Sequence, residues 1–103
     1  MRFGLTEKTI QDICRVFAKY SAVDVAILYG SRAKGNYRKG SDIDLTLQGA
    51  ELSYTLLLTL TEDLDELLLP YKIDLSIFHL LEHSDLKEHI ERVGQVFYRK
   101  EVP

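Results

Sequence analysis

The chain has 103 residues, 46% of them hydrophobic and 28% charged, which suits one small domain over residues 1–103 of an ordinary soluble globular protein. Its formal net charge of −3 excludes a global attraction for nucleic acid, so direct nucleic-acid binding is not expected. The single cysteine, Cys14, excludes an intrachain disulfide and a thiolate zinc site, and no segment has the roughly 20 apolar residues of a membrane span, so we expect a cytoplasmic protein.

Apolar spacing predicts the first elements of the chain. Residues 6–20 are expected to form a helix, with Thr6 as its N-cap and an apolar face made of Ile10, Ile13, Cys14 and Phe17. Residues 24–29 are a short apolar run rich in β-formers, which predicts a strand that ends at Gly30. Residues 41–47 alternate between apolar and polar side chains, which predicts a second strand with one buried and one open face.

The next two elements follow the same reasoning. Residues 53–69 return to helical spacing, with Ser53 as a suitable N-cap and Pro70 as the stop. Residues 71–77 alternate again, which predicts a third strand whose polar side includes Asp74.

The last segment predicts a final helix over residues 84–93, with Ser84 as N-cap and Gly94 as the C-terminal stop. Residues 95–99 fit either a short strand or a packed tail. The order helix, strand, turn, strand, helix, strand, helix predicts an α/β (α+β) fold with helices mainly on one face of the sheet.

Residues 30–44 combine a glycine-rich basic turn with two aspartates one residue apart. Glycine lets backbone N–H groups approach phosphate oxygens closely. We expect at least one cation of the turn to neutralise triphosphate charge, although each also fits a solvated charge run; the four cations are Arg32, Lys34, Arg38 and Lys39. Ser31 also fits a plain helix N-cap. The ending of a Walker loop and the three-glycine spacing of a dinucleotide fingerprint are both missing, which excludes the commoner phosphate loops.

The aspartates of this stretch predict a metal site. Asp42 and Asp44 occupy alternate positions of a predicted strand, so their side chains point to the same side. Asp74 has the matching phase on another strand, and if the two strands are neighbours, three carboxylates meet on one open face. Because such carboxylates repel one another, a divalent cation such as Mg²⁺ would relieve them, and two ions about 3.5–4 Å apart would serve both oxygens of a displacement. The alternative for Asp-x-Asp alone is a solvated surface.

Gly30-Ser31, ten residues and then Asp42-Ile43-Asp44 resembles the signature of the DNA polymerase β-like nucleotidyltransferase superfamily. The sequence Tyr-Gly-Ser-Arg-Ala-Lys-Gly, followed by Ser-Asp-Ile-Asp-Leu, is similar to its smallest members, the minimal nucleotidyltransferase (MNT) domains, which include MntA-like antitoxins. The resemblance implies a small mixed sheet with flanking helices, Mg²⁺ and a nucleoside triphosphate such as ATP. It implies that Gly30 and Ser31 hold the triphosphate and that Asp42, Asp44 and Asp74 form the catalytic and metal-binding set. We expect Arg32 and Lys39 to join the nucleotide-binding set because of their charge.

Minimal members of this superfamily are commonly paired with a separate all-helical HEPN protein, and in MntA-like systems the transferase adds AMP to a tyrosine of that toxic ribonuclease. The resemblance therefore implies adenylyl transfer to a HEPN partner encoded nearby. Two other functions stay open on the sequence. One is a module that neutralises a helical HEPN partner by binding alone, with the site a vestige or a nucleotide sensor, and the other is a transferase acting on a small hydroxylated molecule. The short chain argues against the last, because it has no second domain to hold such an acceptor.

Overall fold

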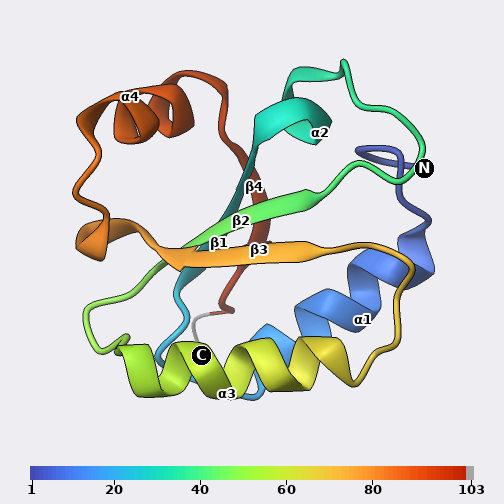
Figure 1. The fold of residues 1–103 in the computed structure, drawn as a ribbon. Helices are drawn as coiled ribbons and strands as arrows, with labels where there is room; N and C mark the ends of the chain where they lie inside the picture. The colour runs from blue at the N-terminus through green and yellow to red at the C-terminus, as the bar shows by residue number, and fades with distance from the viewer. Residues whose placement is uncertain (102–103) are drawn as a thin grey trace.

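A four-stranded mixed sheet forms the centre of the protein (Figure 1). The structure is a computed structural model, and it describes residues 1–101. The elements in chain order are α1 (Glu7–Ala18), β1 (Val25–Tyr29), α2 (Gly30–Lys34), β2 (Ile43–Gln48), α3 (Tyr54–Asp65), β3 (Ile73–Ile77), the 3₁₀ turn η1 (Phe78–Leu80), α4 (Ser84–Val93) and β4 (Gln95–Arg99). Among these described residues, no helix is long and apolar enough to cross a membrane.

The strands lie in the order β3-β2-β1-β4. Strand β1 pairs antiparallel with both β2 and β4, whereas β2 pairs parallel with β3. The expected mixed sheet is confirmed, and residues 95–99 form a strand rather than a packed tail. The parallel pairing makes β2 and β3 neighbours, which is the condition that the predicted carboxylate site requires.

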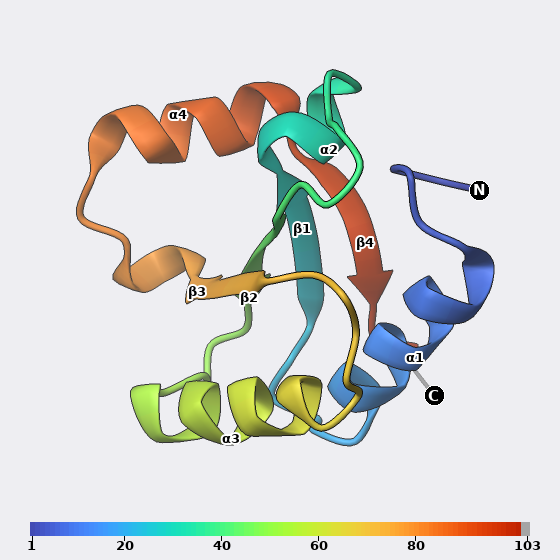
Figure 2. The same cartoon turned by 45° about the vertical axis from the view of Figure 1, so that its right-hand side comes forward.

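The two faces of the sheet have different characters. One face buries apolar side chains of the central strands, and α1 and α3 cover it (Figures 1 and 2); its core residues include Ala26, Leu28, Ile43, Leu45 and Leu47. The shorter helices α2 and α4 lie on the opposite face (Figure 2). The two longest helices thus share one face, and the remaining two flank the face that bears the polar side chains of β2 and β3.

Helix α1 begins as expected, since the Thr6 side chain accepts a hydrogen bond from the Thr9 backbone N–H at 3.2 Å. Helix α3 also begins at its predicted cap, Ser53, but it ends at Asp65, before the predicted end at residue 69. Two residues past the C-cap Glu66, Leu68 adopts a left-handed backbone with φ of 55°, and its side chain is 87% exposed. Pro70 therefore does not end the helix.

The N-cap of α4 is His83, not the predicted Ser84. The His83 Nδ1 atom accepts a hydrogen bond from the Leu86 backbone N–H at 3.2 Å, and Ser84 is the first residue of the helix. The strands also begin later than predicted: β2 starts at Ile43 and β3 at Ile73. Asp42 consequently lies in the loop just before β2.

Candidate active site

Asp44 and Asp74 are directly opposite each other on the neighbouring parallel strands β2 and β3. On its other side, Asp44 is opposite Tyr29, the last residue of β1. Residues at the same register position of a sheet point to the same face, so these three side chains form one row across the sheet. The row lies on the face opposite the core, and the sequence prediction that the strands with Asp44 and Asp74 are neighbours is confirmed.

The three aspartates differ in exposure. Asp44 is half-buried, whereas Asp42 and Asp74 are exposed. Within residues 1–101, no group of three or more aspartate, glutamate, histidine or cysteine side chains stands ready to hold a metal ion. The carboxylates thus border a common site without converging on one point, and a shared cation would require the exposed Asp42 and Asp74 to rotate toward Asp44.

The electrostatics of Asp44 fit a cation. Burial raises the pKa of the Asp44 carboxyl above its usual value of 3.8, and the nearby charges of Asp74 and Asp42 raise it further. Lys72 and His89 act in the opposite direction but do not cancel these effects. A divalent cation with oxygen ligands would offset the repulsion from Asp74 and Asp42 that adds to the effect of burial, so the donor set is chemically suited to Mg²⁺.

Gly30 joins β1 to α2 directly beside Asp44. Its backbone is left-handed, with φ of 74°, and a Cβ atom at this position would overlap the Asp44 carboxylate. Helix α2 begins at Gly30, so Ser31 is its second residue and not the N-cap; Tyr29 precedes the helix and provides no side-chain cap. The first backbone N–H groups of a helix have no intrahelical partner, which leaves the amides of this turn free to face an anion beside Asp44.

Arg32 does not lie where a nucleotide ligand is expected. Its side chain is only 2% exposed, and its guanidinium donates hydrogen bonds to the carbonyl oxygens of Phe3 and Ser41. These contacts use the nitrogen atoms that a phosphate would need, so the structure differs here from the expectation that Arg32 binds the triphosphate.

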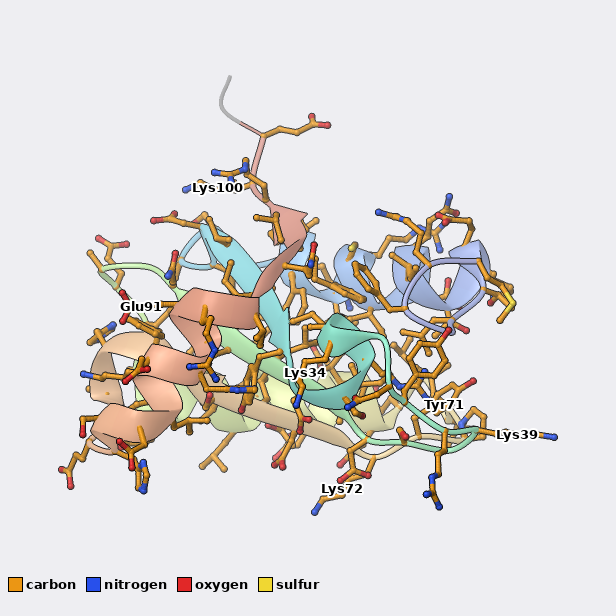
Figure 3. All side chains as sticks on the ribbon, turned by 90° about the horizontal axis from the view of Figure 1, so that it is seen from above. Lys34, Lys39, Tyr71, Lys72, Glu91 and Lys100 are labelled. Atoms are coloured by element: carbon orange, nitrogen blue, oxygen red, sulfur yellow. The ribbon has the colours of Figure 1, made fainter. Side chains whose placement is uncertain are left out.

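The exposed lysines differ in direction (Figure 3). Lys39 points away from the body of the protein at the far side of the loop, whereas Lys34 lies along α2. Lys72 precedes β3 and is close enough to lower the pKa of Asp44. Sequence reasoning overlooked Lys72, although it shares the strand phase of Asp74 and could have been found by that alternation.

Two further side chains of the site, Tyr29 and His89, were also overlooked. Their rings meet edge to face with centroids 6.2 Å apart, which brings α4 over the end of β1. Burial raises the pKa of the Tyr29 hydroxyl, and the charges of Asp44 and Asp74 add to the effect, whereas the nearby Ser76 hydroxyl opposes it. The phenol of Tyr29 therefore belongs to the same polar face as the carboxylates. His89 lies three residues after the apolar Leu86, and this helical spacing is the sequence signal that places both side chains on one face of α4.

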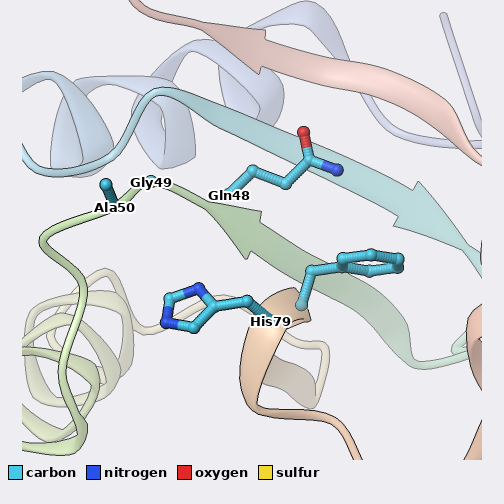
Figure 4. A pocket seen from close by; sticks show the side chains of 5 residues that line it. Gln48, Gly49, Ala50 and His79 are labelled. Carbon is cyan, nitrogen blue, oxygen red and sulfur yellow. The ribbon is translucent and has the colours of Figure 1, made fainter.

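A separate pocket of about 320 Å³ lies at the other end of β2 and β3 (Figure 4). It is lined by Gln48, Gly49, Ala50, Phe78 and His79. None of these residues is a carboxylate, so this pocket is distinct from the row of aspartates.

Comparison with known proteins identifies the family of the chain. The sequence model described as "Polymerase beta, Nucleotidyltransferase" matches residues 11–102. No curated protein sequence matches the chain significantly.

Three solved structures share the fold. A chain of a toxin–antitoxin complex with AMP-PNP is 21% identical, with a TM-score of 0.70 over 94% of this chain and 76% of its own length. A chain of the MntA–HepT toxin–antitoxin is 16% identical, with a TM-score of 0.68 over 92% of this chain and 74% of its own. A chain in the complex of the tri-AMPylated Shewanella oneidensis HEPN toxin with its MNT antitoxin is 16% identical, with a TM-score of 0.68 over 93% and 74%. Because the matched sequence region spans most of the chain, this protein belongs to the polymerase β nucleotidyltransferase family.

Proposed function

We propose that the protein is a Mg²⁺-dependent adenylyltransferase of the cytoplasm that moves AMP from ATP to a tyrosine hydroxyl of a HEPN toxin and so acts as its antitoxin. The observation that carries the proposal is the row of Asp44 and Asp74 on adjacent strands, beside the glycine turn at Gly30. The likeness to chains from complexes of a HEPN toxin with an MNT antitoxin supports the choice of partner.

In the proposed reaction, the acceptor oxygen attacks the α-phosphorus of ATP. The bond from that phosphorus to the bridging oxygen of the β-phosphate breaks, pyrophosphate leaves, and the acceptor hydroxyl passes its proton to the Asp74 carboxylate. Asp74 lies on the edge strand β3, where an acceptor can approach from outside the sheet, so we assign it the contact with the acceptor hydroxyl as well as with metal.

The remaining roles follow from position. Asp42 and Asp44 would hold Mg²⁺, which when bound would stabilise the charge that develops on the phosphate oxygens. The free amides of Gly30 and Ser31 would face the triphosphate. Among the cations, Lys72 already lies near Asp44, whereas Lys39 would have to turn inward from the position in Figure 3.

The test uses ATP labelled at the α-phosphate, Mg²⁺ and the HEPN protein encoded beside this chain's gene. The wild-type protein should label the partner, and the three separate substitutions Asp42→Asn, Asp44→Asn and Asp74→Asn should each reduce labelling at least about a hundredfold, since even outer-shell changes typically cost 10–100-fold. Asp85→Asn is the matched control, because Asp85 lies in the first turn of α4, is exposed, and should leave labelling unchanged.

Three results would contradict the proposal. An unlabelled partner, with nucleotide binding intact, would exclude AMP transfer to that protein. An Asp44→Asn variant that still neutralises the toxin fully would show that binding alone is sufficient. Release of pyrophosphate with a panel of small hydroxylated acceptors, but not with the HEPN protein, would instead indicate a small-molecule transferase.

A further inference from the structure

Arg32 is the only fully buried charged side chain in residues 1–101. Burial of an unpaired cation is strongly unfavourable unless hydrogen bonds replace those that it made with water. Over the same residues no carboxylate forms an ion pair with Arg32. The protein therefore keeps this charge in its interior by other contacts, and those contacts indicate what Arg32 does.

Two hydrogen bonds of Arg32 go to the peptide directly before Asp42. The Arg32 Nε and Nη2 atoms both donate to the Ser41 carbonyl oxygen, at 3.0 and 2.9 Å. A fork of two donors on one oxygen fixes that peptide in both position and orientation. Arg32 belongs to α2, so this contact ties the loop that bears Asp42 to the glycine turn at Gly30.

Aromatic rings extend the connection to β3. The guanidinium carbon lies 4.9 Å from the ring centre of Tyr71 and 5.3 Å from that of Tyr37. Tyr37 belongs to the loop before β2, and Tyr71 leads into β3, three residues before Asp74 (Figure 3). One guanidinium thus contacts the approaches to both strands that bear the carboxylates.

The first residues of the chain also contact the Arg32 guanidinium. Arg32 Nη1 donates to the Phe3 carbonyl oxygen at 2.8 Å. Gly4 has φ of 74°, and a Cβ atom there would overlap Tyr37 and crowd the Arg32 Nη1 atom. The close approach of this segment explains why the guanidinium has almost no exposure to solvent.

We propose that Arg32 is a positioning residue that holds the peptide before Asp42 and the entrance to β3 in place, and thereby sets the spacing of the Asp42 and Asp74 carboxylates without touching the nucleotide. The inference rests on the proposed function in one respect: that the spacing of the Asp42 and Asp74 carboxylates serves metal binding and transfer. The anchoring itself concerns contacts within the chain and can be measured separately.

The main variant is Arg32→Lys, which keeps the charge but has no planar fork. Amide hydrogen exchange should become at least about tenfold faster at residues 41–43 and 71–74 and should stay unchanged in α1. Affinity for Mn²⁺, measured by electron paramagnetic resonance, should fall about 10–100-fold. In the transfer assay kcat should fall by a similar factor while KM for ATP stays within about twofold, because the lost group does not contact ATP.

Three further samples sharpen the experiment. Arg15→Lys is the matched control, because Arg15 is an exposed arginine of α1 and should change none of these values. Added guanidinium ion should restore part of the Mn²⁺ affinity to Arg32→Ala. If Arg32→Lys fails to fold, Tyr71→Leu keeps the carbonyl contacts but removes one aromatic face, and it should weaken Mn²⁺ binding by a smaller factor.

Unchanged exchange and Mn²⁺ affinity in Arg32→Lys, or in Tyr71→Leu where that variant replaces it, would overturn the inference. So would a raised KM for ATP with unchanged kcat, since that result would make Arg32 a nucleotide ligand. A wild-type protein that neither binds Mn²⁺ nor labels the partner would refute the proposed function instead, and the exchange measurement would still decide whether Arg32 anchors the two segments.

Discussion

At the scale of single residues, Asp44 combines burial with repulsion from two like charges. Because its pKa is raised in the folded protein, the folded state binds more protons than the unfolded state once the pH exceeds the usual carboxyl value of 3.8. In the absence of metal, the contribution of Asp44 to stability is therefore most favourable at low pH and declines as the pH rises through the folded pKa. Above that pKa the charged Asp44 destabilises the fold.

We therefore expect Asp44→Asn to stabilise the metal-free protein at pH 7 while it abolishes transfer. Since Asp44 is only half-buried, solvent screening limits the gain to roughly 0.5 kcal/mol, or a rise in Tm of about 2–4 °C. Thermal unfolding in EDTA at pH 3.5 and pH 7 measures it, and the difference from wild type should be smaller at the lower pH. A lower Tm at pH 7 would show that the charged carboxylate is stabilised by a partner.

At the scale of elements, two glycines enclose the five-residue helix α2. Gly30 and Gly35 both have a left-handed backbone, with φ of 74° and 87°, but only Gly30 touches the site. A Cβ at Gly30 would overlap the Asp44 carboxylate, whereas nothing lies within 4 Å of a Cβ at Gly35. The pair therefore separates the cost of the backbone conformation from the cost of crowding Asp44.

We expect Gly30→Ala and Gly35→Ala each to lose about 1–2 kcal/mol of stability, because both place a Cβ on a left-handed residue. Only Gly30→Ala should also lose Mn²⁺ affinity and transfer, by at least about tenfold, because the methyl group displaces the Asp44 carboxylate. Urea unfolding and Mn²⁺ titration provide the two measurements. Equal losses of Mn²⁺ affinity in the two variants would mean that the contact between Gly30 and Asp44 has no part in the site.

The same region shows how far the sequence predicts the site. Strict alternation predicted the faces of β2 and β3, and hence that Asp44 and Asp74 share a face, because strand side chains point alternately up and down. The position of Arg32 could not be predicted, since its partners Phe3, Ser41 and Tyr71 are distant in the sequence and only the fold brings them together. Charge alone suggested a phosphate ligand.

The predicted end of α3 and the predicted start of α4 were wrong for a related reason. Helical spacing continues through the leucines after Asp65, and no glycine or proline marks the end of α3 before Pro70. The helix ends with Glu66 as its C-cap, and two residues later Leu68 adopts a left-handed backbone, although leucine has no intrinsic preference for that conformation. The cap of α4 was misplaced because serine is the commoner cap, whereas the imidazole of His83 provides the acceptor here.

At the scale of the whole molecule, the residues that stabilise the fold and the residues of the candidate site lie on opposite faces of the sheet. The apolar face of the central strands is buried beneath α1 and α3 (Figure 2), whereas Asp44 and Asp74 occupy the opposite face of the sheet. A small domain has only about 5–15 kcal/mol of stability in general, so each large core side chain contributes a substantial part of it. Substitutions on the core face should therefore reduce stability and spare activity, whereas substitutions of the aspartates should reduce activity and spare stability.

We expect Leu47→Ala, in the core, to lower the free energy of unfolding by about 2–5 kcal/mol, because it leaves a cavity behind a side chain with 0% exposure. Leu58→Ala is the matched control, since Leu58 is 66% exposed on α3 and should change stability by less than about 0.5 kcal/mol. Urea unfolding at constant m-value measures both. Leu47→Ala should keep kcat and KM within about twofold per folded molecule, the reverse of Asp44→Asn, because it touches only the core face. A large loss of kcat in folded Leu47→Ala would show that core packing also sets the spacing of the carboxylates across the sheet.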